Sequence, residues 1–127
     1  MEKGEIVIYQ PNDNIKLEVR IEAETVWLNR QQIAVLFDRD VKTIGKHVNN
    51  ALAQELKGKA TIANFATVQK EGDRLVTRGV DYYNLDMILS IGYRVKSQRG
   101  IDFRKWANKV LKEYLLRGYA INQRIER

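Results

Sequence analysis

Cysteine is absent from the 127 residues of the chain, and histidine occurs once. Without cysteine there are no disulfides and no thiolate ligands, which fits a reducing compartment. Gly-rich phosphate-binding loops and clusters of metal ligands are also missing, so the sequence predicts no metal site, no cofactor and no small-molecule substrate. No apolar stretch is long enough to cross a bilayer, and the first residues lack the basic-then-apolar order of a signal peptide. We therefore expect a cytoplasmic protein without a membrane segment.

The scarcity of nucleophiles and bases also argues against an enzyme. His47 is the only histidine that could serve as a general base, and no spaced pair of carboxylates stands out on a helix or strand. A half-buried structural role or a contact with phosphate suits His47 better than catalysis. The sequence therefore predicts that this chain has no catalytic residues of its own.

Positive charge is plentiful, but it is unevenly distributed. The net charge is +6; residues 1–40 carry five Lys or Arg against eight Asp or Glu, a local charge of −3, whereas residues 41–127 carry seventeen against eight, a local charge of +9. Such asymmetry is expected of a protein that presents one basic face to a polyanion such as DNA. Solvated, Lys-rich helices explain it equally well.

Apolar patterning predicts an α+β domain, with an N-terminal β-hairpin and a long C-terminal amphipathic helix around a winged helix-turn-helix-like centre. We expect one domain over residues 1–127, which could be the N-terminal part of a longer protein. Its predicted parts are strands within 5–28, a helix-turn-helix over 30–56, a wing hairpin over 61–78 and C-terminal helices within 85–118, with a basic loop over 93–100.

The helix-turn-helix prediction depends on two helix starts and a small set of packing residues. Asn29 followed by Gln32 forms a capping-box pattern, and Asp40 suits the cap of a second helix. Ala34 lies where the two helices would cross. The positions expected to pack between them are Ile33, Phe37, Ile44 and Val48. Asp38 stands where this motif usually has glycine, and Arg39 where it usually has an apolar residue, so we expect a slightly altered turn.

The second helix would then present its outer face to the major groove. The candidate DNA-binding residues there are Lys42, Thr43, Gly45, Lys46, Asn49 and Asn50. Lysine can contact guanine acceptors or phosphates, asparagine can bond the adenine edge, and glycine permits close approach. An ordinary corner of two helices is the structural alternative.

Two further basic groups extend this surface. Lys70, Arg74 and Arg78 lie on the predicted wing, where they could reach phosphates or a minor groove. Arg94, Lys96 and Arg99, with Arg104 and Lys105 beyond them, surround the predicted start of the last helix, where backbone N–H groups can help to hold phosphate. Charged hairpin tips and solvated loops are common on proteins that bind no nucleic acid.

The run from Val80 to Val95, continued by residues 97–100 and 103–107, resembles the virulence protein RhuM family, and with Asn29–Asn50 the resemblance extends over most of the chain. The same run is similar to the N-terminal DNA-binding domains of phage antirepressors and Bro-type proteins. The resemblance implies a bacterial or phage-derived protein, and it implies that family members are usually longer than this chain. A role in transcription regulation is expected from the predicted helix-turn-helix.

Two partners are therefore expected, double-stranded DNA and a second copy of the chain. A homodimer could form through Leu115, Leu116, Tyr119 and Ile121, which extend the apolar face of the last helix. The alternative function is that of an antirepressor-like protein-interaction module without direct DNA binding. Its surface would be formed by Tyr82, Tyr83, Tyr93 and Trp106.

Overall fold

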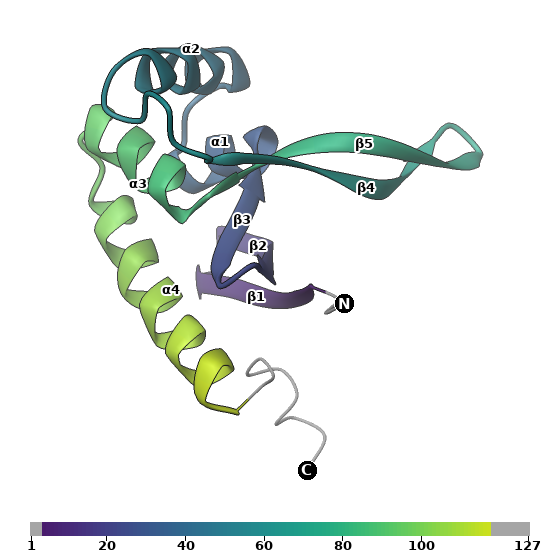
Figure 1. Ribbon diagram of the computed structural model, residues 1–127. Coiled ribbons are helices and arrows are strands. Elements are labelled where there is room, and N and C mark those ends of the chain that lie inside the picture. Colours follow the sequence, from purple (N-terminus) through teal and green to yellow (C-terminus); the bar gives the residue numbers. More distant parts are fainter. Residues whose placement is uncertain (1–3, 118–127) are drawn as a thin grey trace.

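A computed structural model describes residues 4–117 of the chain. In these residues one five-stranded antiparallel sheet, in the order β1-β2-β3-β5-β4, packs against four helices (Figure 1). The elements are β1 (Glu5–Asn12), β2 (Ile15–Glu22), β3 (Thr25–Asn29), α1 (Arg30–Phe37), α2 (Val41–Ala53), β4 (Ile62–Glu71), β5 (Arg74–Asn84), α3 (Leu85–Arg94) and α4 (Gln98–Arg117). The α+β class predicted from the sequence is confirmed.

Strict alternation of apolar and polar residues shapes the first hairpin. Every second residue of β2 is buried, beginning at Ile15 and ending at Ile21, because successive side chains of a strand point to opposite faces. At the turn, the Asn14 backbone N–H donates to the Asn12 side chain over 2.8 Å. This local bond substitutes for a ladder bond and fixes the reversal of the chain.

The third strand joins the same sheet through a turn that the sequence does not announce. Ala23 and Glu24 both have positive φ, 54° and 64°. Two consecutive residues of this kind form the tight turn whose twist matches that of antiparallel strands, although asparagine and glycine are its usual residues. The pairing of Ile21 with Val26 follows, and β3 is thereby placed at the centre of the sheet.

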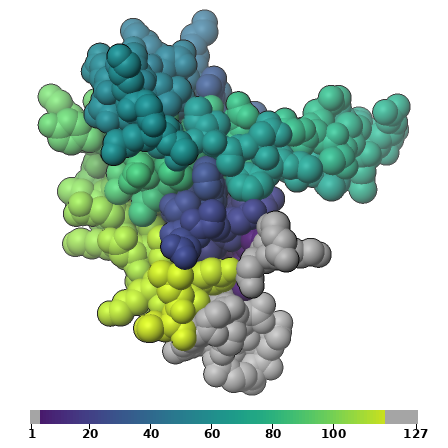
Figure 2. All heavy atoms as spheres, in the orientation of Figure 1, coloured from purple at the N-terminus to yellow at the C-terminus, as the bar shows by residue number. Residues whose placement is uncertain are grey.

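The second hairpin is longer than predicted, because β5 continues to Asn84 and pairs with β3 through residues 82–84. Beyond that pairing, the eight residue pairs from Asn64–Asp81 to Glu71–Arg74 have only each other as partners. At about 3.3 Å per residue this two-stranded part is roughly 26 Å long. It extends away from the rest of the molecule as an arm (Figures 1 and 2).

Aromatic packing anchors the root of this arm on the sheet. The Phe65 ring meets Trp27 edge-on at 5.5 Å between centroids and Tyr82 at 5.4 Å, and the Arg20 guanidinium lies 4.3 Å above Phe65. Edge-to-face pairs and cation–π contacts each add to the burial of apolar area. An isolated hairpin is only marginally stable, so these contacts stabilise the root of the arm.

The helices cover the face of the sheet opposite to the one that carries Trp27 and Phe65, and they enclose the core. Phe103, Ala107 and Val110 of α4 are buried, and Phe103 packs edge-on against Tyr9 of β1 at 5.1 Å between ring centroids. The apolar stripe predicted for the last helix is therefore part of the core. Partly buried side chains extend the same stripe, namely Trp106, Leu111 and Tyr114.

The prediction of a basic loop over residues 93–100 was wrong. Tyr93 and Arg94 continue α3, and α4 already begins at Gln98, so only residues 95–97 separate the two helices. The positive φ of Lys96, 53°, makes the corner, and the Ser97 hydroxyl accepts the Arg99 backbone N–H to start the next helix. A corner this tight places the basic residues on helices and not on an open loop.

Candidate nucleic-acid interface

The two central helices begin at the residues that the sequence predicts. Asn29 accepts the Gln32 backbone N–H over 2.8 Å, and the Gln32 side chain accepts the Asn29 N–H in return, which completes a capping box. Asp40 accepts the Thr43 N–H over 2.7 Å at the start of α2. Between the helices, the predicted packing residues are buried: Ile33, Ala34, Phe37, Ile44 and Val48. Helix α2 ends at Ala53, before the predicted Leu56.

The turn between these helices keeps the left-handed conformation that glycine commonly supplies. Asp38 has φ 54° and ψ 51°, a region that aspartate tolerates better than most residues. Arg39 reaches across the turn, where its guanidinium donates to the carbonyl oxygens of Phe37 at 3.0 Å and Val95 at 3.4 Å. The two departures from the usual motif therefore have structural roles, and Arg39 ties the turn to the α3–α4 corner.

The outer face of α2 carries polar side chains that are exposed or partly exposed. Lys42, Lys46 and Asn49 are exposed, and Thr43 and Asn50 are partly exposed. Within residues 4–117, neither lysine forms an ion pair. Two free ammonium groups and amide side chains on one helix face are suited to phosphate oxygens and base edges.

Gly45 is an exception, and its expected place on the outer face was wrong. It is buried, and a Cβ added there would lie 2.9 Å from Nη1 of Arg30. Helical periodicity turns Gly45 inward, towards α1, one residue after the buried Ile44. The close approach that this glycine permits is that of the Arg30 guanidinium to α2.

Arg30 is the residue that sequence reasoning missed. Its Nη2 donates to the Tyr83 hydroxyl over 3.0 Å, and its guanidinium lies 5.9 Å from the centre of the Tyr83 ring. The side chain lines a groove between the helix pair and the hairpin, together with Asn29, Gln31, Val41, Gln69, Val80, Asp81 and Tyr83. Its position as the first residue of a helix after a capping asparagine was the only sequence feature that could have drawn attention to it.

The basic residues of the hairpin differ from one another in their availability. Lys70 and Arg74 are exposed near the tip of the arm, and no ion pair within residues 4–117 engages them. Arg78 is bound to Glu71 by two hydrogen bonds of 2.5 and 2.8 Å. Hydrogen bonds from Arg78 lower the pKa of Glu71 from its ordinary value. Arg78 is therefore partly neutralised.

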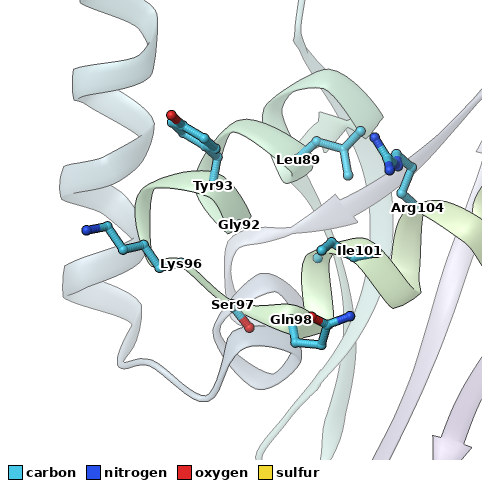
Figure 3. Close-up of a pocket in the computed structure, with 9 residues that line it drawn as sticks. Leu89, Gly92, Tyr93, Lys96, Ser97, Gln98, Ile101 and Arg104 are labelled. Carbon is cyan, nitrogen blue, oxygen red and sulfur yellow. The ribbon is translucent and has the colours of Figure 1, made fainter.

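Two of the five residues predicted for the second basic cluster form contacts within the fold. Arg94 binds Glu55 with bonds of 2.6 and 3.0 Å, and Arg99 donates to the Leu36 carbonyl oxygen over 3.1 Å. Lys96 is exposed and, with Arg104, lines a hollow between α3 and α4 (Figure 3). The cluster is thus divided between internal contacts and surface charge; Lys105 is exposed on α4.

His47 lies among cations at the inner edge of α2. Burial and the neighbouring charges of Arg94, Lys46 and Arg39 lower its pKa below 6.5, so the imidazole is neutral at pH 7. Its Nδ1 is buried without a hydrogen-bond partner. Among residues 4–117 no group of three or more His, Asp or Glu side chains is placed to hold a metal ion, and none of the helices there is long and apolar enough to span a membrane.

The surfaces expected for protein partners are only partly present. Tyr82 and Tyr83 are buried and Trp106 is partly buried, whereas 85% of Tyr93 is exposed. Leu115 and Leu116 are exposed on α4, 58% and 76%. Tyr119 and Ile121, the other two residues expected at a homodimer interface, lie outside the described residues.

A comparison with models of known protein families matches the C-terminal half of the chain, which includes the α3–α4 corner. The model of the virulence protein RhuM family matches residues 60–127, which include the hairpin, α3 and α4 but not α1 or α2. The resemblance noted for Asn29–Asn50 is thus outside the matched segment. No curated protein and no solved structure matches the chain. Because the match spans more than half of its length, the chain belongs to the virulence protein RhuM family.

Proposed function

We propose that this chain binds double-stranded DNA as a winged helix-turn-helix module, with α2 in the major groove and the β4–β5 hairpin as the wing. The observation that carries the proposal is the outer face of α2, where Lys42, Lys46 and Asn49 are exposed and, within residues 4–117, neither lysine forms an ion pair; the β4–β5 hairpin projects from the same domain (Figure 1). A helix of this kind fits the width of the major groove.

The connections between the elements support the same proposal. Strand β3 leads directly into α1, and after α2 the chain forms the hairpin, whose second strand returns to pair with β3. The left-handed Asp38 and the buried contacts between the helices fit the turn and crossing of a helix-turn-helix.

The charges of the proposed surface predict how binding responds to salt. Lys42, Lys46, Lys70 and Arg74 would each neutralise a phosphate, and every such contact contributes about −0.9 to the slope of log affinity against log salt. In the alternative function, as a protein-interaction module, the exposed Tyr93 is the observation in favour. That function requires no steep salt dependence with DNA.

A mobility-shift assay of the full chain with random duplex DNA at low salt tests the proposal. We expect a shift that weakens steeply as salt rises, and a slope reduced by about two units in the double variant Lys42→Ala, Lys46→Ala. The matched control is Lys57→Ala with Lys59→Ala, which removes the same charge from exposed positions between α2 and β4. Absence of any shift by the wild-type chain at low salt overturns DNA binding.

A further inference from the structure

Arg30 stands out because its guanidinium has no carboxylate partner among the described residues. The side chain is partly buried, yet among residues 4–117 no carboxylate lies within ion-pair distance of it. Burying a guanidinium without a counter-charge costs free energy, and the single hydrogen bond to Tyr83 satisfies only one of its five donors. Its other N–H groups are not among the buried atoms that lack a partner, so they remain open to the groove.

The surroundings of Arg30 hold it in one place. The Tyr83 hydroxyl and ring fix it from the sheet side, and on the other side it lies against the bare backbone of Gly45. Any side chain at Gly45 would push the guanidinium out of this position, because a Cβ would lie only 2.9 Å from Nη1. Arginine held in this way presents a rigid fork of donors, the arrangement that binds phosphate oxygens well.

With α2 in the major groove and the hairpin as the wing, as proposed above, this groove would lie between the two DNA-contacting parts. It is formed by the starts of α1 and α2 on one side and by the hairpin on the other, so it separates the two parts that would enter neighbouring grooves of a duplex. Asp81 is the acidic residue among the groove's lining side chains, and it accepts a hydrogen bond from Asn64 over 3.0 Å. Asn29 and Gln31 add polar side chains to the same groove.

We infer that Arg30 is a phosphate-binding residue for a DNA phosphodiester that crosses this groove, and that Gly45, which has no side chain, leaves the space that the Arg30 guanidinium occupies. The inference rests on the proposed DNA binding, and it assigns Gly45 an indirect part: the glycine touches no DNA but keeps the guanidinium in place. It also explains why a cation without a counter-charge is retained between the helix pair and the hairpin.

The test measures affinity for a duplex as a function of salt with the full chain and three single variants. Arg30→Ala should weaken binding roughly five- to tenfold near 0.1 M salt and reduce the slope by about 0.9, the value for one lost phosphate contact. Gly45→Ala should weaken binding in the same direction, and the double variant should be no worse than Arg30→Ala alone, because both act on one side chain. Thermal melting of each variant checks that the fold is kept.

Tyr83→Phe separates phosphate binding from a structural role. It removes the hydrogen bond to Arg30 but keeps the Tyr83 ring and the charge of Arg30, so the salt slope should fall by less than it does in Arg30→Ala. A Tyr83→Phe variant that loses as much slope as Arg30→Ala, or an Arg30→Ala variant that binds DNA with an unchanged slope, overturns the inference. Failure of the wild-type chain to bind any duplex instead overturns the proposed function, so the two failures are distinguishable.

Discussion

The Arg99 guanidinium donates a hydrogen bond of 3.1 Å to the backbone carbonyl oxygen of Leu36, 63 residues earlier in the chain. Leu36 belongs to the last turn of α1, whose carbonyl groups have no partner within the helix, and α1 has no basic residue of its own in that turn. Arg99 therefore supplies from α4 the positive charge that favours a helix C-terminus. In this way the segment matched by the family model supports the helix pair that lies outside it.

Replacement of Arg99 should loosen this support. We expect Arg99→Ala to lower the free energy of unfolding by about 2 kcal/mol, since a hydrogen bond from a charged donor is lost and a partly buried carbonyl is left unpaired. Arg104→Ala, which removes an equal charge from an exposed position of α4, should change it by less than about 0.5 kcal/mol. Urea unfolding followed by circular dichroism measures both, and equal effects would contradict the role given to Arg99.

Gly92 and Gly100 meet at the α3–α4 crossing, with the Phe37 ring of α1 against both. A Cβ on Gly92 would lie 3.0 Å from Phe37 Cζ, whereas a Cβ on Gly100 would have only ordinary contacts of 3.5 Å or more. Phe37 is 1% exposed, so its ring has little room to move away. Gly92 is thus needed for close packing, and Gly100 much less so.

The paired substitutions make this difference measurable. Gly92→Ala should destabilise the chain by about 1 kcal/mol or more, because overpacking exceeds the gain in helix propensity. Gly100→Ala should be neutral or stabilising by up to about 1 kcal/mol. Thermal unfolding of the two variants, identical in composition, checks the prediction, and the reverse order of stability would show that Phe37 can yield.

Local sequence patterns predicted most of the helices and strands, because each pattern depends only on residues that are close in the sequence. Alternation along Ile15–Ile21 gave the strand, and the caps at Asn29 and Asp40 gave the helix starts, since each depends on residues no more than a few positions apart. The turn at Ala23 and Glu24 was not recognisable, because neither residue is a usual former of that turn.

The candidate site was harder to predict because several of its charges are committed to distant partners. Arg94 and Arg99 looked free in sequence, but Glu55 and Leu36 engage them from 39 and 63 residues away. Arg30 drew no attention because Tyr83, the residue that holds it, lies 53 residues later. Composition therefore located the basic half of the chain, and only the three-dimensional contacts separate its available cations from its structural ones.

The Glu55–Arg94 pair gives the stability of the chain a defined dependence on pH. Hydrogen bonds from Arg94 and from the Ser90 hydroxyl lower the pKa of Glu55 from 4.5 to about 2. A carboxylate whose pKa is lower in the folded than in the unfolded chain stabilises the fold above the unfolded value. Its contribution is therefore complete above pH 4.5 and is lost as the pH falls towards 2.

Glu55→Gln should remove this contribution. The variant should be less stable than the wild type at pH 7, and the difference between their unfolding midpoints should shrink between pH 4.5 and pH 2. In a background that already carries Arg94→Gln, the same substitution should have a much smaller effect, because the main partner is gone. A wild-type-to-variant difference that stays constant across this pH range would rule out the pair as its source.

Glu71 restrains the hairpin's contribution to the proposed DNA binding, because its carboxylate occupies Arg78 with two hydrogen bonds. Glu71→Gln removes one negative charge and weakens the hold on Arg78, so we expect tighter binding to duplex DNA and a salt slope steeper by up to about 0.9.

The control is Asp13→Asn in the β1–β2 turn, which removes the same charge at the opposite edge of the sheet from the hairpin. Fluorescence anisotropy titrations at several salt concentrations compare the two. If both variants gain affinity equally, the gain comes from net charge alone and Arg78 has no local part in binding; a gain confined to Glu71→Gln, fading at high salt, places the contact on the hairpin.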